Sequence, residues 1–133
     1  MAIIVGPKGL QEAACFYAKL LGIDSLDYNL EITRKHLDNY DRGICMFDKD
    51  TKEAWIELDK KQSSISIYSV LAHEMVHLKQ YVTGELEDIR AGVAMWYGKE
   101  IICDYWDAPW EIDAYGRQPG LYARWQEFKE RQL

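Results

Sequence analysis

The feature that most constrains this chain is an H-E-x-x-H motif at residues 73–77, set inside an apolar stretch. Hydroxyls at Ser63 and Ser64 offer N-caps and a glycine follows at Thr83-Gly84, so we expect a helix from about residue 63 to Val82. Residues i and i+4 are neighbours on one face of a helix, so His73 and His77 place two imidazole nitrogens close together. The motif therefore predicts a helix that supplies two ligands to one metal ion.

Zinc is the metal that such ligands favour. Glu74 lies about 100° round the helix from His73, where it borders the metal without having to bind it. A general base that acts on a metal-bound water belongs at this position. The motif thus predicts Zn²⁺ as the cofactor and Glu74 as the catalytic residue.

A catalytic zinc usually has three protein ligands, and the motif supplies two. No histidine follows His77, because the only other histidine, His36, precedes the motif. Glu111 is the best candidate, since it lies between Trp110 and Ile112 at the start of a predicted helix, and a charged group among apolar residues needs a partner. The alternative is that Glu111 is a surface acid stabilised by the dipole of that helix.

The segments before the motif predict one helix and a small sheet. Residues 10–21 have helical periodicity and end at Gly22, and residues 26–33 alternate as a strand with one buried face. Turn-forming residues over 38–43 lead to predicted strands at 44–47 and 54–58. Three consecutive strands with short connections favour an antiparallel meander.

The segments after the motif predict a hairpin and a C-terminal helical region. Residues 85–90 are charged and are expected at the surface, and residues 93–102 predict a hairpin. Asp107 is a plausible cap for a helix with Pro109 in its first turn. Pro119-Gly120 is expected to break or kink this helix, which continues over 121–132, and the small Ala114 allows a close approach to the motif helix.

Composition excludes several classes of partner. The chain has 133 residues, a size typical of one domain, and 16 basic against 22 acidic residues give a net charge of −6. A negative net charge does not favour binding to nucleic acid or to an anionic membrane. Three cysteines without a C-x-x-C pair, and the lack of a signal-peptide or membrane-spanning pattern, predict a cytoplasmic protein, with a monomer as the default.

The motif at 73–77, followed by Trp110-Glu111-Ile112-Asp113-Ala114, resembles the gluzincin branch of the zincin metallopeptidases in its smallest single-domain form, the minigluzincins. The chain is also similar to small SprT-like and ImmA/IrrE-like peptidases, although the third histidine often used by SprT proteins is absent. The sequences around residues 73–77 and around residues 110–114 are similar to those of uncharacterised proteins of tailed phages. This resemblance would place the protein in the cytoplasm of a phage host.

The resemblance implies one zincin-like metallopeptidase domain over 1–133, of the α+β class. Its expected parts are an N-terminal helix, a three-stranded antiparallel sheet, the motif helix, a small hairpin and a C-terminal glutamate-bearing helix. It further implies His73, His77 and Glu111 as zinc ligands and Glu74 as the base in the hydrolysis of a peptide or protein substrate. An extended substrate would add to the strand at 54–58 by backbone pairing.

The chain departs from the larger gluzincins at one position. Those proteins place an aspartate four residues after the ligand glutamate to orient a histidine, and Tyr115 occupies that position here. Asp113 lies at a different angle on the helix and cannot simply replace that aspartate. The sequence therefore does not identify which residues orient the two histidine rings. Tyr115 is a candidate donor to an oxyanion, although an aromatic residue at this spacing is more often part of a core.

Two other functions compete with an active peptidase. In the first, zinc only stabilises the fold of a binding or structural protein. In the second, the peptidase is latent until a partner activates it, with residues 97–105 or the segment after Pro119 covering the site.

Overall fold

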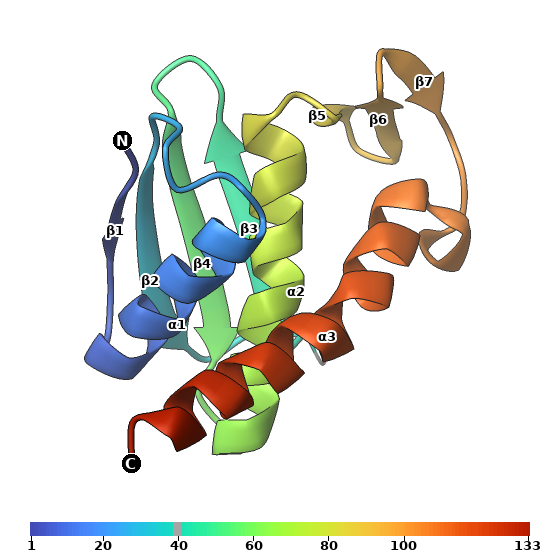
Figure 1. Ribbon diagram of the computed structural model, residues 1–133. Coiled ribbons are helices and arrows are strands. Elements are labelled where there is room, and N and C mark those ends of the chain that lie inside the picture. Colours follow the sequence, from blue (N-terminus) through green and yellow to red (C-terminus); the bar gives the residue numbers. More distant parts are fainter. Residues whose placement is uncertain (39–40) are drawn as a thin grey trace.

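The computed structural model describes residues 1–38 and 41–133, so residues 39 and 40 of the predicted turn lie outside the described residues. The described chain is of the α+β class, as predicted, and Figure 1 shows its elements. In chain order the elements are β1 (Ile3–Val5), α1 (Lys8–Leu20), β2 (Asn29–Lys35), β3 (Gly43–Asp48), β4 (Glu53–Asp59), α2 (Ser64–Val82), β5 (Leu86–Arg90), β6 (Val93–Trp96), β7 (Lys99–Ile101), the 3₁₀ helix η1 (Tyr105–Asp107) and α3 (Pro109–Arg131).

The main sheet is mixed, with the strand order β1-β2-β4-β3. β4 lies inside the sheet, parallel to β2 and antiparallel to β3, and β1 adds a fourth strand parallel to β2, so the predicted three-stranded antiparallel sheet is wrong. β3 and β4 are neighbours because a tight hairpin connects them. The connection from β2 to β3 is longer, so β3 does not pair with β2, and β4 lies between these two strands. β3 is therefore an edge strand, and the predicted substrate edge at 54–58 is wrong because both edges of β4 are paired.

One face of the main sheet is covered by helices. Side chains on β2 and β4 alternate between buried and more exposed positions, which is the pattern of a sheet with a single packed face. Figure 1 shows α1 and α2 on the same side of the sheet, with α3 crossing them on the side away from the strands. The motif helix α2 therefore lies between the sheet and α3, in contact with both layers.

The ends of the motif helix follow the predicted capping signals. The Ser63 hydroxyl accepts a hydrogen bond from the Ser66 backbone N–H at 3.1 Å, and Gly84 has a φ of +80° just beyond the last turn. Residues 73–77 lie in the middle of the 19-residue helix and are all buried. The motif therefore lies in the buried interior of a helix whose two ends have the predicted signals.

A second, smaller sheet follows α2. The predicted hairpin is present as β6 and β7, with the turn at Tyr97 and Gly98. Residues 85–90 were predicted only as charged surface, but Leu86–Arg90 form the additional strand β5, in which Leu86 is buried opposite Trp96. This sheet and η1 lead the chain to the start of α3 (Figure 1).

The C-terminal helix differs from its prediction at two points. Asp107 belongs to η1, and the N-cap of α3 is Ala108 without a side-chain cap, so the predicted cap is wrong. The helix also continues through Pro119 without a break. Proline removes one hydrogen bond there, to the carbonyl of the exposed Tyr115, and the buried Leu121 beyond it keeps the helix against the core. Among the described residues, no helix combines the length and apolar character needed to cross a membrane.

Candidate metal centre

Three buried side chains from two helices meet between α2 and α3. His73 and His77 come from consecutive turns of α2, and Glu111 comes from the first turn of α3. The two histidine Nε2 atoms are 3.2 Å apart, and Glu111 Oε1 lies 3.1 Å from His73 Nε2 and 3.2 Å from His77 Nε2. The structure therefore brings together all three ligand residues predicted from the sequence.

The spacing of these atoms fits a tetrahedral metal ion. Ligands placed tetrahedrally at the ~2.0–2.1 Å of zinc–nitrogen bonds are about 3.3–3.4 Å from one another. The 3.1–3.2 Å separations among the three ligand atoms are close to that value. His73, His77 and Glu111 thus form a buried group that is able to bind a metal ion.

Small residues allow the two helices to approach at this point. Ala114 is completely buried one turn after Glu111, as its size suggested, and Ala72 is completely buried beside the motif histidine. Ala114 lies between Glu111 and Gln118, which both contact α2, so a larger side chain there would push α3 away from α2 and separate Glu111 from the histidines. Ala114 therefore helps to set the distance between the ligands.

The charges of the site depend on one another. Burial alone would raise the pKa of Glu111, but hydrogen bonds from His73 and His77, with the charges of both imidazoles, lower this pKa to about 2. Burial lowers the pKa of His77, but the hydrogen bond to Glu111 and the charges of Glu74 and Glu111 outweigh it and raise that pKa. The buried carboxylate thus attracts positive charge, which a proton or a metal cation can supply.

Glu74 faces a cleft beside the three ligands. The cleft has a volume of about 570 Å³, and His73, Glu74 and Gly43 are among its lining residues. Burial raises the pKa of Glu74, with the charges of the two histidines opposing this effect. In the described part of the chain no side chain hydrogen-bonds to the Glu74 carboxylate, so this group is available to a molecule in the cleft.

The first residue of the edge strand β3 lies directly against Glu74. A Cβ atom added to Gly43 would lie 2.6 Å from Val70 Cγ1 and 3.0 Å from Glu74 Cγ. Only glycine leaves this space free, so the strand and the motif helix approach each other closely beside the candidate base. The predicted turn residue Gly43 therefore has a packing role at the site.

Two glutamines that the sequence reading missed hold the histidines. Gln80 Oε1 lies 2.8 Å from His77 Nδ1, and Gln118 Oε1 lies 2.9 Å from His73 Nδ1. Asp113 contacts neither ring but accepts a hydrogen bond from Gln80 at 3.0 Å. Gln80 is one helical turn from His77, and a polar residue at that spacing inside a buried face was the signal available in the sequence.

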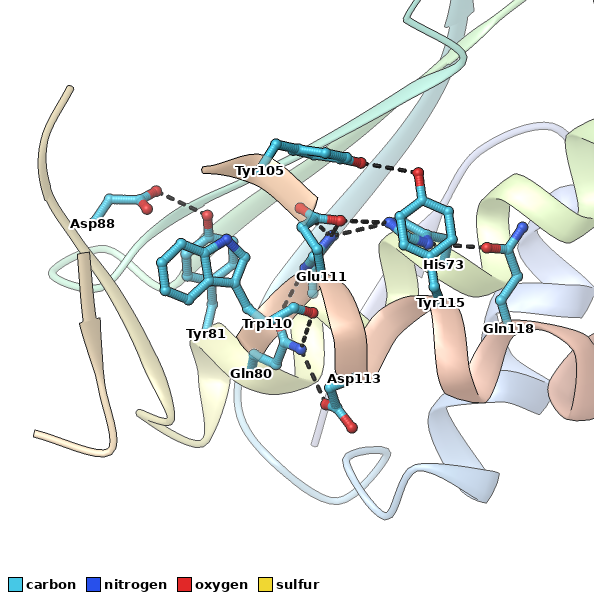
Figure 2. Close-up of polar contacts among 11 residues, drawn as sticks. His73, Gln80, Tyr81, Asp88, Tyr105, Trp110, Glu111, Asp113, Tyr115 and Gln118 are labelled. Carbon is cyan, nitrogen blue, oxygen red and sulfur yellow. Dashed lines mark hydrogen bonds and ion pairs between the residues drawn. The ribbon is translucent and has the colours of Figure 1, made fainter. Parts of the chain in front are cut away.

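A pair of tyrosines borders the same cleft. The Tyr115 ring packs against the His73 ring at a centroid distance of 4.4 Å, and its hydroxyl lies 2.9 Å from the hydroxyl of Tyr105. Figure 2 shows the His73 side chain between Glu111 and Gln118, with the two tyrosine hydroxyls directed toward each other. Tyr105 lies on η1, and the sequence predicted it only as the end of a segment that could cover the site, without a role of its own.

Comparisons of the chain with protein-family models, curated proteins and solved structures find no match in any of the three.

Proposed function

We propose that this chain is a zinc-dependent metallopeptidase of the gluzincin type. The observation that carries the proposal is the meeting of His73, His77 and Glu111 at tetrahedral spacing, with the Glu74 carboxylate in the adjoining cleft. A metal needed only for folding does not require a free carboxylate in an open cleft beside it. The arrangement favours a site at which a metal and a base act on the same molecule.

Two imidazoles and one carboxylate favour zinc among the metals available to proteins. A three-ligand zinc site supplies a Lewis acid that polarises a carbonyl group and lowers the pKa of a coordinated water. In this chain His73, His77 and Glu111 would hold the ion, and the zincin-like character of the fold is part of the same proposal.

Glu74 would carry the protons of the reaction. Its carboxylate takes a proton from the attacking water in the cleft and then delivers that proton to the amine that leaves as the peptide bond breaks. Burial favours the neutral carboxyl, so the raised pKa of Glu74 brings proton release closer to neutral pH. The same side chain is thereby suited to both transfers.

The edge strand β3 would bind the substrate backbone. Within residues 1–38 and 41–133, β3 pairs with β4 alone, and its first residue, Gly43, lines the cleft next to Glu74. An extended peptide that pairs with the outer edge of β3 would bring a peptide bond past the candidate base. Recognition would then rest partly on backbone hydrogen bonds and would be largely independent of sequence.

The tyrosine pair would stabilise the oxyanion. Two hydroxyls share one hydrogen bond, and the Tyr105 hydroxyl also lies within hydrogen-bond reach of Glu111, so it would turn to the carbonyl oxygen of a substrate when Glu111 binds a metal. The pKa of Tyr105 is raised, first by burial and then by its hydrogen bond to Tyr115, so the phenol keeps its proton. Such a donor stabilises the charge that develops in the transition state.

The latent form of the peptidase has one candidate covering segment. Tyr105, at the end of the predicted segment 97–105, lines the cleft directly. The part of α3 beyond Pro119 instead packs on α1, where Trp125 contacts Phe16 and Lys129 pairs with Glu12. If a partner regulates access to the site, we expect it to act on the segment that carries Tyr105.

The test compares wild type with Glu74→Gln, each purified without chelators and assayed for zinc content and for cleavage of a quenched-fluorescent peptide library. We expect both proteins to bind zinc and only wild type to cleave, with the exposed Glu127→Gln as a matched control that behaves as wild type. Equal cleavage by Glu74→Gln would refute the assignment of the base. Zinc binding without cleavage by any variant would contradict the peptidase proposal and favour a zinc-stabilised binding protein.

A further inference from the structure

The two glutamines beside the histidines have more than a packing role. We propose that Gln80 and Gln118 are positioning residues that hold a hydrogen on Nδ1 of both histidines and direct each Nε2 at the metal site, where a bound metal would replace the hydrogen bonds that the Nε2 atoms make with Glu111. This inference rests on the metal-binding part of the proposed function and is independent of peptidase activity.

The amide of Gln80 can point only one way. Its Nε2 lies 2.9 Å from the Trp110 carbonyl oxygen and 3.0 Å from Asp113 Oδ2, and both of these atoms are acceptors at neutral pH. The NH₂ group must therefore face them, which leaves Oε1 facing His77 Nδ1 at 2.8 Å. Because Oε1 can only accept, His77 Nδ1 carries a hydrogen, which leaves Nε2, 3.2 Å from Glu111 Oε1, as the atom that would bind a metal.

Burial makes this arrangement obligatory. Gln80 is completely buried, so no water can replace a lost partner, and its two N–H groups and its oxygen are all used. Glutamate at this position would bring no donor to Asp113 and would place two carboxylates together in a buried site. Leucine has a similar volume but leaves His77 Nδ1, Asp113 Oδ2 and the Trp110 carbonyl without this partner.

Gln80 also ties the two ligand-bearing helices together. It belongs to α2, whereas Trp110 and Asp113 flank Glu111 on α3. Asp113 is held in turn by Arg117, whose Nε lies 2.7 Å from Asp113 Oδ1. A single amide therefore orients one ligand, His77, and fixes the turn of α3 that carries the other, Glu111.

Gln118 holds His73 in a more adaptable way. Its Oε1 lies 2.9 Å from His73 Nδ1 and its Nε2 lies 2.9 Å from the Ser69 hydroxyl, which can donate as well as accept. The side chain is half-buried at the edge of the cleft. Glutamate therefore fits here, since the Ser69 hydroxyl can rotate to donate to it, and a carboxylate partner makes the His73 imidazole a stronger ligand.

The first experiment measures zinc affinity by competition with a chromophoric chelator, using folded proteins stripped of metal. We expect Gln80→Leu to weaken zinc binding by about 10–100-fold, the range typical of such partners, with Gln118→Leu also weaker than wild type. Gln80→Glu should weaken binding, whereas Gln118→Glu should equal or exceed wild type. The exposed Gln126→Leu is the matched control and should leave the affinity unchanged.

The second experiment reads the tautomers directly by ¹⁵N NMR of the histidine rings in metal-free protein at mildly alkaline pH. Wild type should show His73 and His77 as Nδ1–H, and each glutamine-to-leucine variant should lose this preference at its own histidine. Gln118→Leu keeps the test decisive if Gln80→Leu does not fold. Unchanged tautomers in Gln118→Leu, or an affinity equal to that of Gln126→Leu, would overturn the proposal. If wild type binds no zinc, the metal centre itself is wrong, and the NMR result still decides the tautomers.

Discussion

Replacing Gly43 with alanine tests the close contact between the edge strand and the motif helix. The added Cβ would lie 2.6 Å from Val70 Cγ1 and 3.0–3.1 Å from Cγ and Oε2 of Glu74. Val70 is β-branched and on a helix, so its χ1 has little freedom to relieve the clash. We expect overpacking to cost toward the upper end of about 1–3 kcal/mol, offset by about 0.4–1 kcal/mol from the less flexible unfolded chain.

The net expectation for Gly43→Ala is a loss of about 1–2 kcal/mol in the free energy of unfolding. Urea unfolding followed by tryptophan fluorescence measures it, with an unchanged m-value showing that only stability has altered. The matched control is Gly116→Ala on α3, where the added Cβ meets no atom within 4 Å. That substitution should stabilise the protein by about 0.5–1 kcal/mol, because glycine is unfavourable inside a helix.

A double variant identifies the cause of the loss. Val70→Ala removes the atom closest to the added Cβ, so Gly43→Ala should cost much less in that background, with an interaction energy of at least about 0.5 kcal/mol. If Gly43→Ala instead stabilises the protein as Gly116→Ala does, β3 does not approach the motif helix at Glu74. The proposed binding of substrate along β3 would lose its structural basis.

Three further predictions concern the metal centre and the cleft. Ala114→Leu should lower the free energy of unfolding by about 1–3 kcal/mol and also weaken zinc binding, because it moves Glu111 away from the histidines; unchanged zinc affinity would contradict this coupling. Tyr105→Phe should reduce kcat about 10²–10³-fold with little change in KM, and an unaltered kcat would exclude a role for this phenol in the transition state. Removing zinc with a chelator should lower the free energy of unfolding by about 4 kcal/mol when free zinc had been at a thousand times its Kd, and a melting temperature insensitive to zinc would count against a folded-state site.

The helical parts of the fold could be predicted because their signals are local. The i, i+4 histidines, the serine cap and the glycine at the C-terminus placed the motif helix within a residue or so of its observed bounds. Strand order was not predictable in the same way, because alternation reports which face of a strand is buried and not which strands are neighbours. β1 has only three residues, too few for a periodic pattern. Nothing in the sequence of β4 indicates that it pairs with both β2 and β3.

The metal ligands could be predicted because metal binding requires a fixed spacing of residue types in the sequence. The residues that reach the site only through tertiary packing could not be predicted. The motif selects His73 and His77 as a pair, and the apolar surroundings of Glu111 marked it for a buried partner. Gln118 is two helical turns beyond Glu111, on the same face of a helix that Pro119 was expected to interrupt, so its place beside His73 was hidden. Tyr105 reaches the cleft through η1, whose path depends on the second sheet and not on any local pattern.

The most direct test of the metal centre is the zinc content of the purified protein, measured by mass spectrometry for wild type, Glu74→Gln and Glu111→Ala without exposure to chelators. Near-stoichiometric zinc is expected in wild type and in Glu74→Gln, where all three ligands remain, with a marked loss in Glu111→Ala. A wild-type protein that contains no zinc and takes up none when it is supplied would contradict the three-ligand site and, with it, the proposed metallopeptidase.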